Sequence, residues 1–225
     1  MTGSMRSRRG VLAGAAGLAA AAVAPRAWAL SPLACMATPK AMEGPYYFDP
    51  GMERADIAED RPGVPLRLSI KVVDAPTCAP IAGARVDAWH CDGIGFYSGY
   101  DRQGDGRDVS ARGRSFLRGT QFADREGGLA FATIYPGWYA GRTTHIHLKV
   151  FLDRRTLLTT QIYFPDDVNE RVYRANAPYR DRKAVRETFN GNDGLFRRAG
   201  EEAVAVVTQE RDGYRALFTI GVARG

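Results

Sequence analysis

The chain has 225 residues, a length that suits one domain with an additional arm, and its hydrophobic fraction of 45% is enough for a sizeable core. Its formal net charge of +6 does not indicate nucleic-acid binding, because four arginines and no acid lie in the first 29 residues, and removing their charge leaves +2. The rest of the chain has no basic stripe interleaved with aromatic residues, so nucleic acid is excluded as a partner.

The first 29 residues are typical of an export signal. Ser7–Leu12 carries a twin-arginine pattern at Arg8 and Arg9, an uncharged run follows over residues 11–24, and Ala27–Ala29 offers small residues for cleavage. The apolar run is too short to span a bilayer comfortably. We therefore expect a protein exported to the periplasm or outside the cell, without a stable membrane span once the signal is removed. An N-terminal anchor or a buried helix is the alternative.

The three cysteines would all enter an oxidising compartment, where one disulfide leaves one thiol unpaired. If residues 67–74 and 84–91 form a hairpin, Cys78 lies near its turn and Cys91 at its far end, which disfavours a bond between these two. A bond between Cys35 and Cys91 stays open, and so does the interpretation that all three cysteines are unlinked.

Residues 30–65 form an arm that is rich in proline and glycine and lacks clear periodicity. Beyond it, short segments rich in β-branched residues alternate in polarity and are separated by turn residues, a pattern typical of strands. These segments are Leu66–Val73, Ala84–His90, Leu129–Ile134, Thr143–Phe151, Leu157–Phe164, Ala203–Thr208 and Ala216–Val222. Residues 98–128 are polar and rich in glycine and arginine, so we expect a functional or mobile loop there rather than core.

Many short strands without regular intervening helices predict an all-β fold, an antiparallel β-sandwich with long loops and few short helices. Asp166–Tyr173 has helical spacing and begins with acids, which suit the start of a short helix. We divide the chain into a signal peptide at residues 1–29, an N-terminal arm at 30–65 and a β-sandwich domain at 66–225, which we expect to hold the functional site.

Two of the three histidines lie two residues apart, at His145 and His147, within a predicted strand. Because alternate side chains of a strand share a face, both imidazoles point together while Ile146 and Leu148 point into apolar packing. Imidazole is a ligand for iron, copper, zinc and nickel. The pair therefore indicates a metal site, and with it an enzyme.

Two aromatic segments flank this strand in the sequence. Trp89–Tyr97 and Thr133–Tyr139 each run from a strand into a turn that contains glycine, and each ends in tyrosine. A phenolate is a hard anionic ligand that suits Fe(III): two phenolates offset two of the three charges of the ion, and the ion in turn lowers the pKa of the phenols. Tyr97 and Tyr139 thus join the two histidines as candidate ligands.

The combined pattern Trp-His-x-Asp-x-x-Gly-x-Tyr, Thr-Ile-x-Pro-Gly-x-Tyr and Arg-x-x-His-x-His resembles the intradiol ring-cleavage dioxygenases over roughly residues 40–165. The resemblance implies a non-haem Fe(III) enzyme that cleaves a catechol-type substrate with O2 to a muconate-type diacid. It implies Tyr139 and His147 as axial ligands and Tyr97 and His145 as equatorial ligands.

The resemblance also implies roles for neighbouring residues. Tyr139 would leave the metal and take up a substrate proton, and the cationic Arg142 would stabilise charge on the ring carbon that O2 attacks. Gln161 falls where the family has a glutamine near the oxygen-reactive face. In the segment Glu43-Gly-Pro-Tyr-Tyr, Tyr46 or Tyr47 would contact the substrate, although both tyrosines could equally pin the arm to the sandwich.

Two other interpretations stay open. A cupin-type or facial two-histidine-one-carboxylate Fe(II) site would use Asp153 as its nearest acid, past the expected end of the strand. An exported non-catalytic β-sandwich module that binds aromatic or carbohydrate ligands would share the fold without the chemistry. His90 is expected to serve packing or to support the ligands. The sequence leaves open which catechol is the substrate and whether the chain forms a homo-oligomer.

Overall fold

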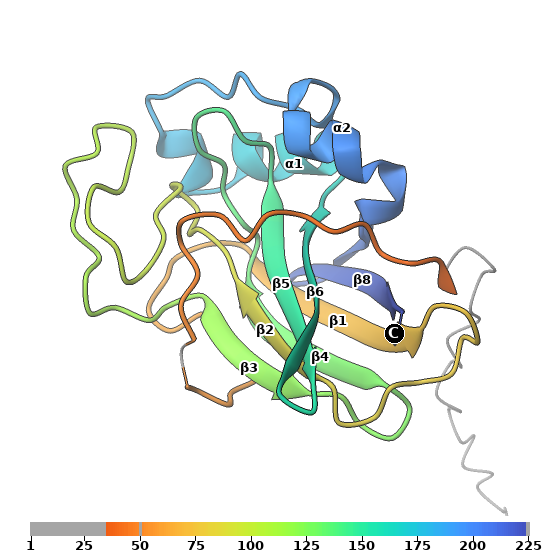
Figure 1. Cartoon of the computed structure of the whole chain (residues 1–225). Coiled ribbons are helices and arrows are strands. Elements are labelled where there is room, and N and C mark those ends of the chain that lie inside the picture. The colour runs from red at the N-terminus through yellow and green to blue at the C-terminus, as the bar shows by residue number, and fades with distance from the viewer. Residues whose placement is uncertain (1–34, 50, 224–225) are drawn as a thin grey trace, which may run out of the picture.

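The computed structural model describes residues 35–49 and 51–223, which form two four-stranded sheets stacked into a sandwich (Figure 1). The twin-arginine signal expected at residues 1–29 lies outside the described residues and stays a prediction. Within the described ranges, no helix is long and apolar enough to cross a membrane.

One sheet has the order β4-β1-β8-β7 and the other the order β3-β2-β5-β6. The strands are β1 (Pro65–Asp74), β2 (Arg85–Trp89), β3 (Arg118–Phe122), β4 (Gly128–Ile134), β5 (His145–Leu152), β6 (Arg155–Tyr163), β7 (Val206–Glu210) and β8 (Gly213–Val222). The helices are α1 (Asp166–Ala175) and α2 (Gly194–Ala199), with 3-10 turns η2 (Tyr179–Asp181), η3 (Asn190–Asn192) and η4 (Glu201–Ala203). The prediction of an all-β sandwich with few short helices is confirmed, and β1 and β8 form its one parallel pair in the described ranges.

Alternation of apolar and polar residues builds the core between the sheets. In β1, every second residue from Leu66 to Val72 is buried, and the residues between them are more exposed. The facing sheet contributes the buried apolar residues Val86, Ala88, Ile146, Leu148 and Val150. Burying one such side chain contributes about 1.5–3 kcal/mol, so this shared core fixes which face of β5 points outward.

The structure differs from the sequence interpretation of two segments, a hairpin considered for residues 67–74 and 84–91 and a loop expected at residues 98–128. Residues 67–74 and 84–91 do not form a hairpin, because β1 pairs with β4 and β8 in one sheet while β2 pairs with β3 and β5 in the other. Alternation fixes which face of a strand is buried, but it does not select the partner strand. Residues 98–128 are not all loop, since β3 lies within them and its Arg118 and Thr120 are buried.

The arm lies against the outer face of the β3-β2-β5-β6 sheet, and Figure 1 shows it in orange, crossing β5 and β6. Backbone hydrogen bonds fasten it to both edge strands of that sheet. The Ala41 amide donates to the Thr159 carbonyl of β6 over 2.9 Å, and the Arg54 amide donates to the Thr120 carbonyl of β3 over 3.0 Å. The face of β5 that points away from the core is therefore covered by the arm.

A disulfide joins Cys35 to Cys78, whose Cα atoms are 5.2 Å apart, and Cys91 is free and buried. Sequence alone does not determine this pairing. In the fold, the bond ties the arm to the connection between β1 and β2, whereas Cys91 packs beside Trp89 and Tyr97. The arm is thus held covalently as well as by hydrogen bonds.

Replacing Cys35 and Cys78 together by serine is expected to lower the free energy of unfolding by about 3 kcal/mol, because a cross-link between residues 43 positions apart restricts the unfolded chain. Urea unfolding of the oxidised wild-type protein and of the double variant measures the difference. Wild-type protein unfolded in a reducing agent is the control and should match the variant. Equal stability of the oxidised protein and the variant would contradict the prediction.

Candidate metal centre

His145 and His147 are the first and third residues of β5, and both are buried, with exposed fractions of 1% and 3%. Ile146 between them is fully buried in the core between the sheets. The two imidazoles therefore lie on the face that the arm covers, where their Nε2 atoms are 3.1 Å apart. Gly44 of the arm lies against His147: a Cβ at position 44 would be 3.5 Å from the imidazole ring of His147.

Two tyrosines from separate loops complete the cluster. Tyr97 follows β2, and Tyr139 precedes β5. Their hydroxyl oxygens lie 3.3 and 3.2 Å from Nε2 of His145, respectively. Tyr97 is fully buried, whereas Tyr139 is only partly buried. The structure thus brings the four candidate ligands to one point.

One hydrogen bond of the cluster fixes the tautomer of His145 and leaves the lone pair of its Nε2 available. Nδ1 of His145 lies 2.7 Å from the Thr143 carbonyl, which can only accept, so Nδ1 carries the proton and Nε2 is a free acceptor. Burial lowers the pKa of both imidazoles. Burial also raises the pKa of Tyr97 well above its ordinary value and that of Tyr139 to about 12. The cluster is therefore neutral by itself and offers nitrogen and oxygen donors to a cation.

The spacing of these donor atoms fits a single metal ion. Metal–imidazole bonds are about 2.0–2.1 Å long, so two ligands at a right angle around one ion lie about 3 Å apart. The three distances from Nε2 of His145 to its neighbours, between 3.1 and 3.3 Å, match that separation. Two imidazole nitrogens and two phenolic oxygens are ligand types that suit iron.

Arg142 and Gln161 lie beside the cluster. Nη1 of Arg142 is 3.5 Å from Nε2 of His145, and Nη2 of Arg142 donates to Oε1 of Gln161, which lies on β6 directly across from His147. Nε of Arg142 donates to Oδ2 of Asp193 over 2.9 Å. Sequence reasoning missed Asp193, whose one sequence signal is its position as a helix-capping residue before α2.

The chain is similar to known proteins in sequence and in fold. A family model described as Dioxygenase matches residues 42–181, more than half of the chain. The solved structure of an intradiol ring-cleavage dioxygenase from Tetranychus urticae superposes with a TM-score of 0.75 and 30% identity, covering 84% of this chain and 95% of that one. The chain belongs to the intradiol ring-cleavage dioxygenase family.

One further solved structure has a lower TM-score, and a curated relative matches a shorter stretch of the chain. The dioxygenase domain of a dioxygenase–carbohydrate-binding fusion from Streptomyces sp. SirexAA-E has a TM-score of 0.60 and 29% identity, covering 84% of this chain and 99% of that domain. Catechol 1,2-dioxygenase 1 of Acinetobacter lwoffii is 30% identical over 153 residues, which are 58% of this chain and 47% of that protein. The chain thus spans about half the length of the curated intradiol dioxygenases that it matches.

The two arm tyrosines differ in their contacts with the tyrosine–histidine cluster. The ring of Tyr46 stacks on Tyr97, with centroids 4.6 Å apart and planes at 23°. Tyr47 packs against Trp89 instead, and its hydroxyl donates to Oδ2 of Asp87 over 2.9 Å. Burial and the Asp87 carboxylate raise the pKa of Tyr47. Tyr46 is therefore the arm tyrosine that contacts a candidate ligand directly, and Tyr47 fastens the arm.

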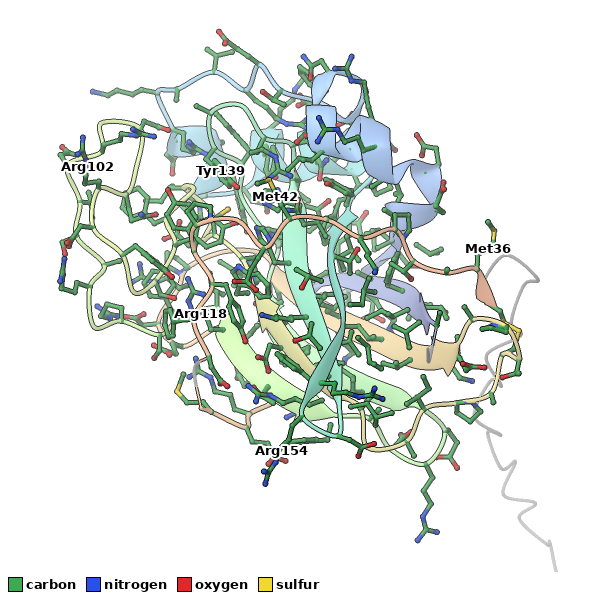
Figure 2. The ribbon with its side chains drawn as sticks, in the orientation of Figure 1. Met36, Met42, Arg102, Arg118, Tyr139 and Arg154 are labelled. Carbon is green, nitrogen blue, oxygen red and sulfur yellow. A yellow bond between two sulfur atoms is a disulfide. The ribbon has the colours of Figure 1, made fainter. Side chains whose placement is uncertain are left out.

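The structure excludes Asp153 as a ligand. Asp153 lies in the turn between β5 and β6, and at about 3.3 Å of rise per strand residue it is roughly 20 Å from His147. Figure 2 shows Arg154 of that turn and Tyr139 at opposite ends of the sheet. A facial site of two histidines and this carboxylate is therefore ruled out.

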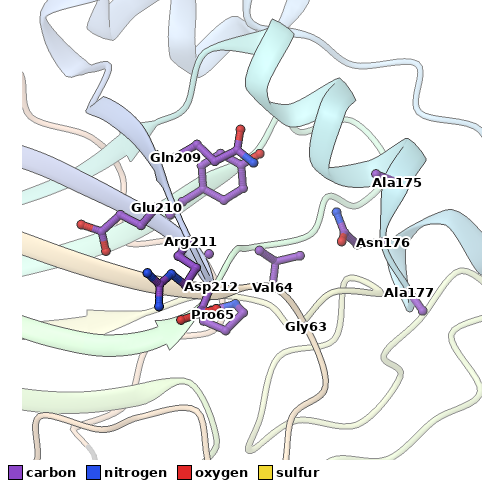
Figure 3. A pocket seen from close by; sticks show the side chains of 12 residues that line it. Gly63, Val64, Pro65, Ala175, Asn176, Ala177, Gln209, Glu210, Arg211 and Asp212 are labelled. Carbon is purple, nitrogen blue, oxygen red and sulfur yellow. The ribbon is translucent and has the colours of Figure 1, made fainter.

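A surface pocket lies apart from the cluster, between the end of α1 and the turn that joins β7 to β8 (Figure 3). Its lining comes from residues 63–65, 175–177 and 209–214, and no candidate ligand or substrate-contact residue is among them. The candidate site residues therefore lie outside this pocket.

His90 is buried away from the four candidate ligands and is held by two hydrogen bonds of 2.8 Å. Nδ1 donates to the Cys91 carbonyl, and Nε2 accepts from Oγ1 of Thr133. The bond in which Nε2 accepts needs a neutral ring, and burial lowers the pKa of His90 to about 4. The residue therefore links β2 to β4 as a neutral packing element.

Acid is expected to weaken the fold through His90. The pKa of His90 in the folded state, about 4, lies below its ordinary value of about 6.5. Between these two pH values the unfolded state binds one more proton than the folded state. The free energy of unfolding therefore falls as the pH falls. The loss attributable to His90 between pH 7.5 and pH 5 is about 2 kcal/mol. Urea unfolding at both pH values should show a correspondingly smaller loss for His90→Gln, which does not titrate. Equal losses in the two proteins would count against this assignment.

Proposed function

We propose that this protein is a non-haem Fe(III) intradiol dioxygenase that cleaves a catechol-type aromatic diol with O2 to a muconate-type diacid. The observation that carries the proposal is the convergence of two phenolic oxygens and His147 Nε2 within 3.1–3.3 Å of His145 Nε2. Iron is the metal typical of the family. The names of the relatives, catechol and chlorocatechol 1,2-dioxygenases, support a catechol as substrate.

The donor set favours the ferric state. Two phenolates would offset two of the three positive charges of Fe(III), and two neutral imidazoles would complete a site that leaves room for substrate. When bound, this ion would act as a Lewis acid toward the diol and as a template for its orientation. We propose Tyr97, Tyr139, His145 and His147 as its ligands.

The side chains around the cluster would supply the remaining chemistry. Tyr139 is the partly exposed member and lies in a loop, so its Oη is suited to accept one proton from a hydroxyl of the diol. Arg142 places a fixed positive charge beside the cluster, where negative charge develops on the aromatic ring. Gln161 holds one edge of that guanidinium.

The arm would close the site against water and form one wall of the substrate pocket. Gly44 lies over His147, and the Tyr46 ring stacks on Tyr97. The Met42 carbonyl accepts from Nε2 of Gln161 over 3.0 Å, which ties this part of the arm to β6. A planar aromatic substrate would therefore meet an aromatic wall, which favours stacked or edge-to-face contact.

The test uses the iron-loaded full chain. We expect a red-brown colour from tyrosinate-to-iron charge transfer, a shift of the band to longer wavelength when catechol is added without oxygen, and oxygen uptake with catechol, protocatechuate or hydroxyquinol. His147→Ala is the control and should lose the colour and the uptake. A protein that binds these diols but consumes no oxygen would instead be a non-catalytic binding module, and the proposal would be wrong.

We also propose that the protein is exported to the periplasm or beyond. The twin-arginine pattern at Arg8 and Arg9 supports this, and so does the disulfide between Cys35 and Cys78, since disulfides persist in oxidising compartments. Changing Arg8 and Arg9 together to lysine is expected to retain the protein in the cytoplasm, as measured by cell fractionation. Undiminished export of that variant would contradict the proposal.

A further inference from the structure

Asp193 is a buried carboxylate at the junction between η3 and α2, with an exposed fraction of 1%. Each of its oxygens accepts two hydrogen bonds. Oδ1 accepts from the amides of Leu195 and Phe196, over 2.7 and 3.2 Å, and so caps α2. Oδ2 accepts from Nε of Arg142 and from the amide of Thr143, both over 2.9 Å. One carboxylate thus joins a distant helix start to the segment that precedes β5.

The guanidinium of Arg142 is held at two of its three nitrogens. Nε is bound to Asp193, and Nη2 is bound to Oε1 of Gln161, which itself accepts from the Tyr163 hydroxyl over 3.1 Å. The third nitrogen, Nη1, faces Nε2 of His145 at 3.5 Å. Because the group is planar, fixing two nitrogens fixes the direction of the third. Asp193 is therefore one of two contacts that aim Nη1 at the metal-ligand cluster.

We propose that Asp193 is a positioning residue for the ring-cleavage reaction: it holds Arg142 in the orientation that stabilises charge on the substrate ring. This inference rests on the function proposed above. Asp193 lies beyond residues 42–181, the stretch that the family model matches, so the segment after α1 would contribute to the site. A preorganised charge needs no reorientation during the reaction, so loss of its anchor should slow turnover more than it weakens binding.

The competing explanation is that Asp193 only caps α2, and asparagine separates the two roles. Asparagine caps helices about as well as aspartate. However, its side chain has a single oxygen, so it can serve the amides of Leu195 and Phe196 or the donors of Arg142 and Thr143, but not both sets. If the oxygen caps the helix, the amide NH2 faces the Nε–H of Arg142, and two donors meet. Asp193→Asn should therefore keep the cap and lose the anchor.

Asp166→Asn is the matched control. Asp166 accepts from Nη2 of Arg186 and from the amide of Asn190, so it also pairs a buried arginine and holds the same stretch of chain. The hydrogen-bond partners of the Asp166 side chain in the described part of the chain are Asn169, Arg186 and Asn190, and none of them is Arg142. A general loosening of this stretch would affect both variants alike, whereas loss of the anchor would affect only Asp193→Asn.

The first experiment measures oxygen uptake by the iron-loaded full chain with catechol. We expect Asp193→Asn to lower kcat about thirtyfold with KM within about threefold of wild type, and Asp166→Asn to keep kcat within about threefold. The visible spectrum of both variants should match wild type. In an Arg142→Ala background, Asp193→Asn should cost less than about threefold more, because the two residues act as a unit. An unchanged kcat, or a full thirtyfold cost in that background, would overturn the inference.

The second experiment does not depend on activity. In the full chain labelled with 15N-arginine and kept free of iron, the Nε–H of Arg142 should exchange slowly with solvent. Exchange should become at least about tenfold faster in Asp193→Asn and stay unchanged in Asp166→Asn. Unchanged exchange in Asp193→Asn would overturn the inference even if the enzyme is active. If the wild type consumes no oxygen, the proposed function fails, and the positioning role fails with it, whatever the exchange rates are.

Discussion

Tyr139→Phe is expected to lower kcat for catechol cleavage about a hundredfold or more, since removing a positioned proton acceptor typically costs that much. The phenyl ring keeps the shape of the side chain but lacks the Oη that lies 3.2 Å from Nε2 of His145. Tyr97 cannot replace it, because Tyr97 is fully buried beneath Tyr46 and has no freedom to move toward the substrate. Steady-state oxygen uptake at saturating catechol measures the effect.

Tyr135→Phe is the matched control for this experiment. Tyr135 is a fully buried tyrosine four residues earlier in the same segment, and its hydroxyl donates to Oδ1 of Asn169 over 2.7 Å. Its loss should cost about 1 kcal/mol of stability and leave kcat within about threefold of wild type. Full activity in Tyr139→Phe, or an equal loss of activity in the two variants, would show that the hydroxyl of Tyr139 has no particular part in turnover.

Local sequence patterns carried the prediction of the cluster. The side-chain period of a strand places His145 and His147 on one face without knowledge of the partner strands. The tyrosines were found because each ends a short segment whose residue order resembles the family pattern, although nothing in strand periodicity would bring Tyr97 and Tyr139 together. Their meeting depends on β2 and β5 being neighbours in one sheet, and this pairing is set by the whole fold.

Long-range polar contacts escaped prediction for a physical reason. Asp193 meets Arg142 across 51 positions in the sequence. Strand β3 has no apolar series, because its buried residues are Arg118, Gly119 and Thr120. The arm covers this strand: a Cβ at position 119 would meet the side chain of Ile57 at 2.6 Å. A strand buried under an irregular segment has polar residues with specific partners, and hydrophobic alternation does not detect it.

Arg118 shows how such a strand is stabilised. Nη1 donates to the Tyr46 carbonyl of the arm over 2.6 Å, while Nε and Nη2 donate to the hydroxyl and the carbonyl of Ser98, both over 2.8 Å. The guanidinium also lies 4.3 Å from the centroid of the Phe48 ring. Burial lowers the pKa of Arg118 to about 10, so the side chain stays charged at neutral pH. This one cation therefore joins the arm, the loop after β2 and the sheet.

Arg118→Ala is expected to lower the free energy of unfolding by about 4 kcal/mol, because it leaves the carbonyl oxygens of Tyr46 and Ser98 without their donor and opens a cavity under the arm. It should also raise KM for catechol, since Tyr46 would lose the contact that holds its backbone above Tyr97. Urea unfolding and steady-state kinetics measure the two effects. Arg114→Ala, which removes an exposed ion pair with Asp60 in the same segment, should cost less than about 1 kcal/mol. If Arg118→Ala unfolded like Arg114→Ala, the arm would be held by its backbone bonds and the disulfide alone, and substrate affinity should then be unaffected.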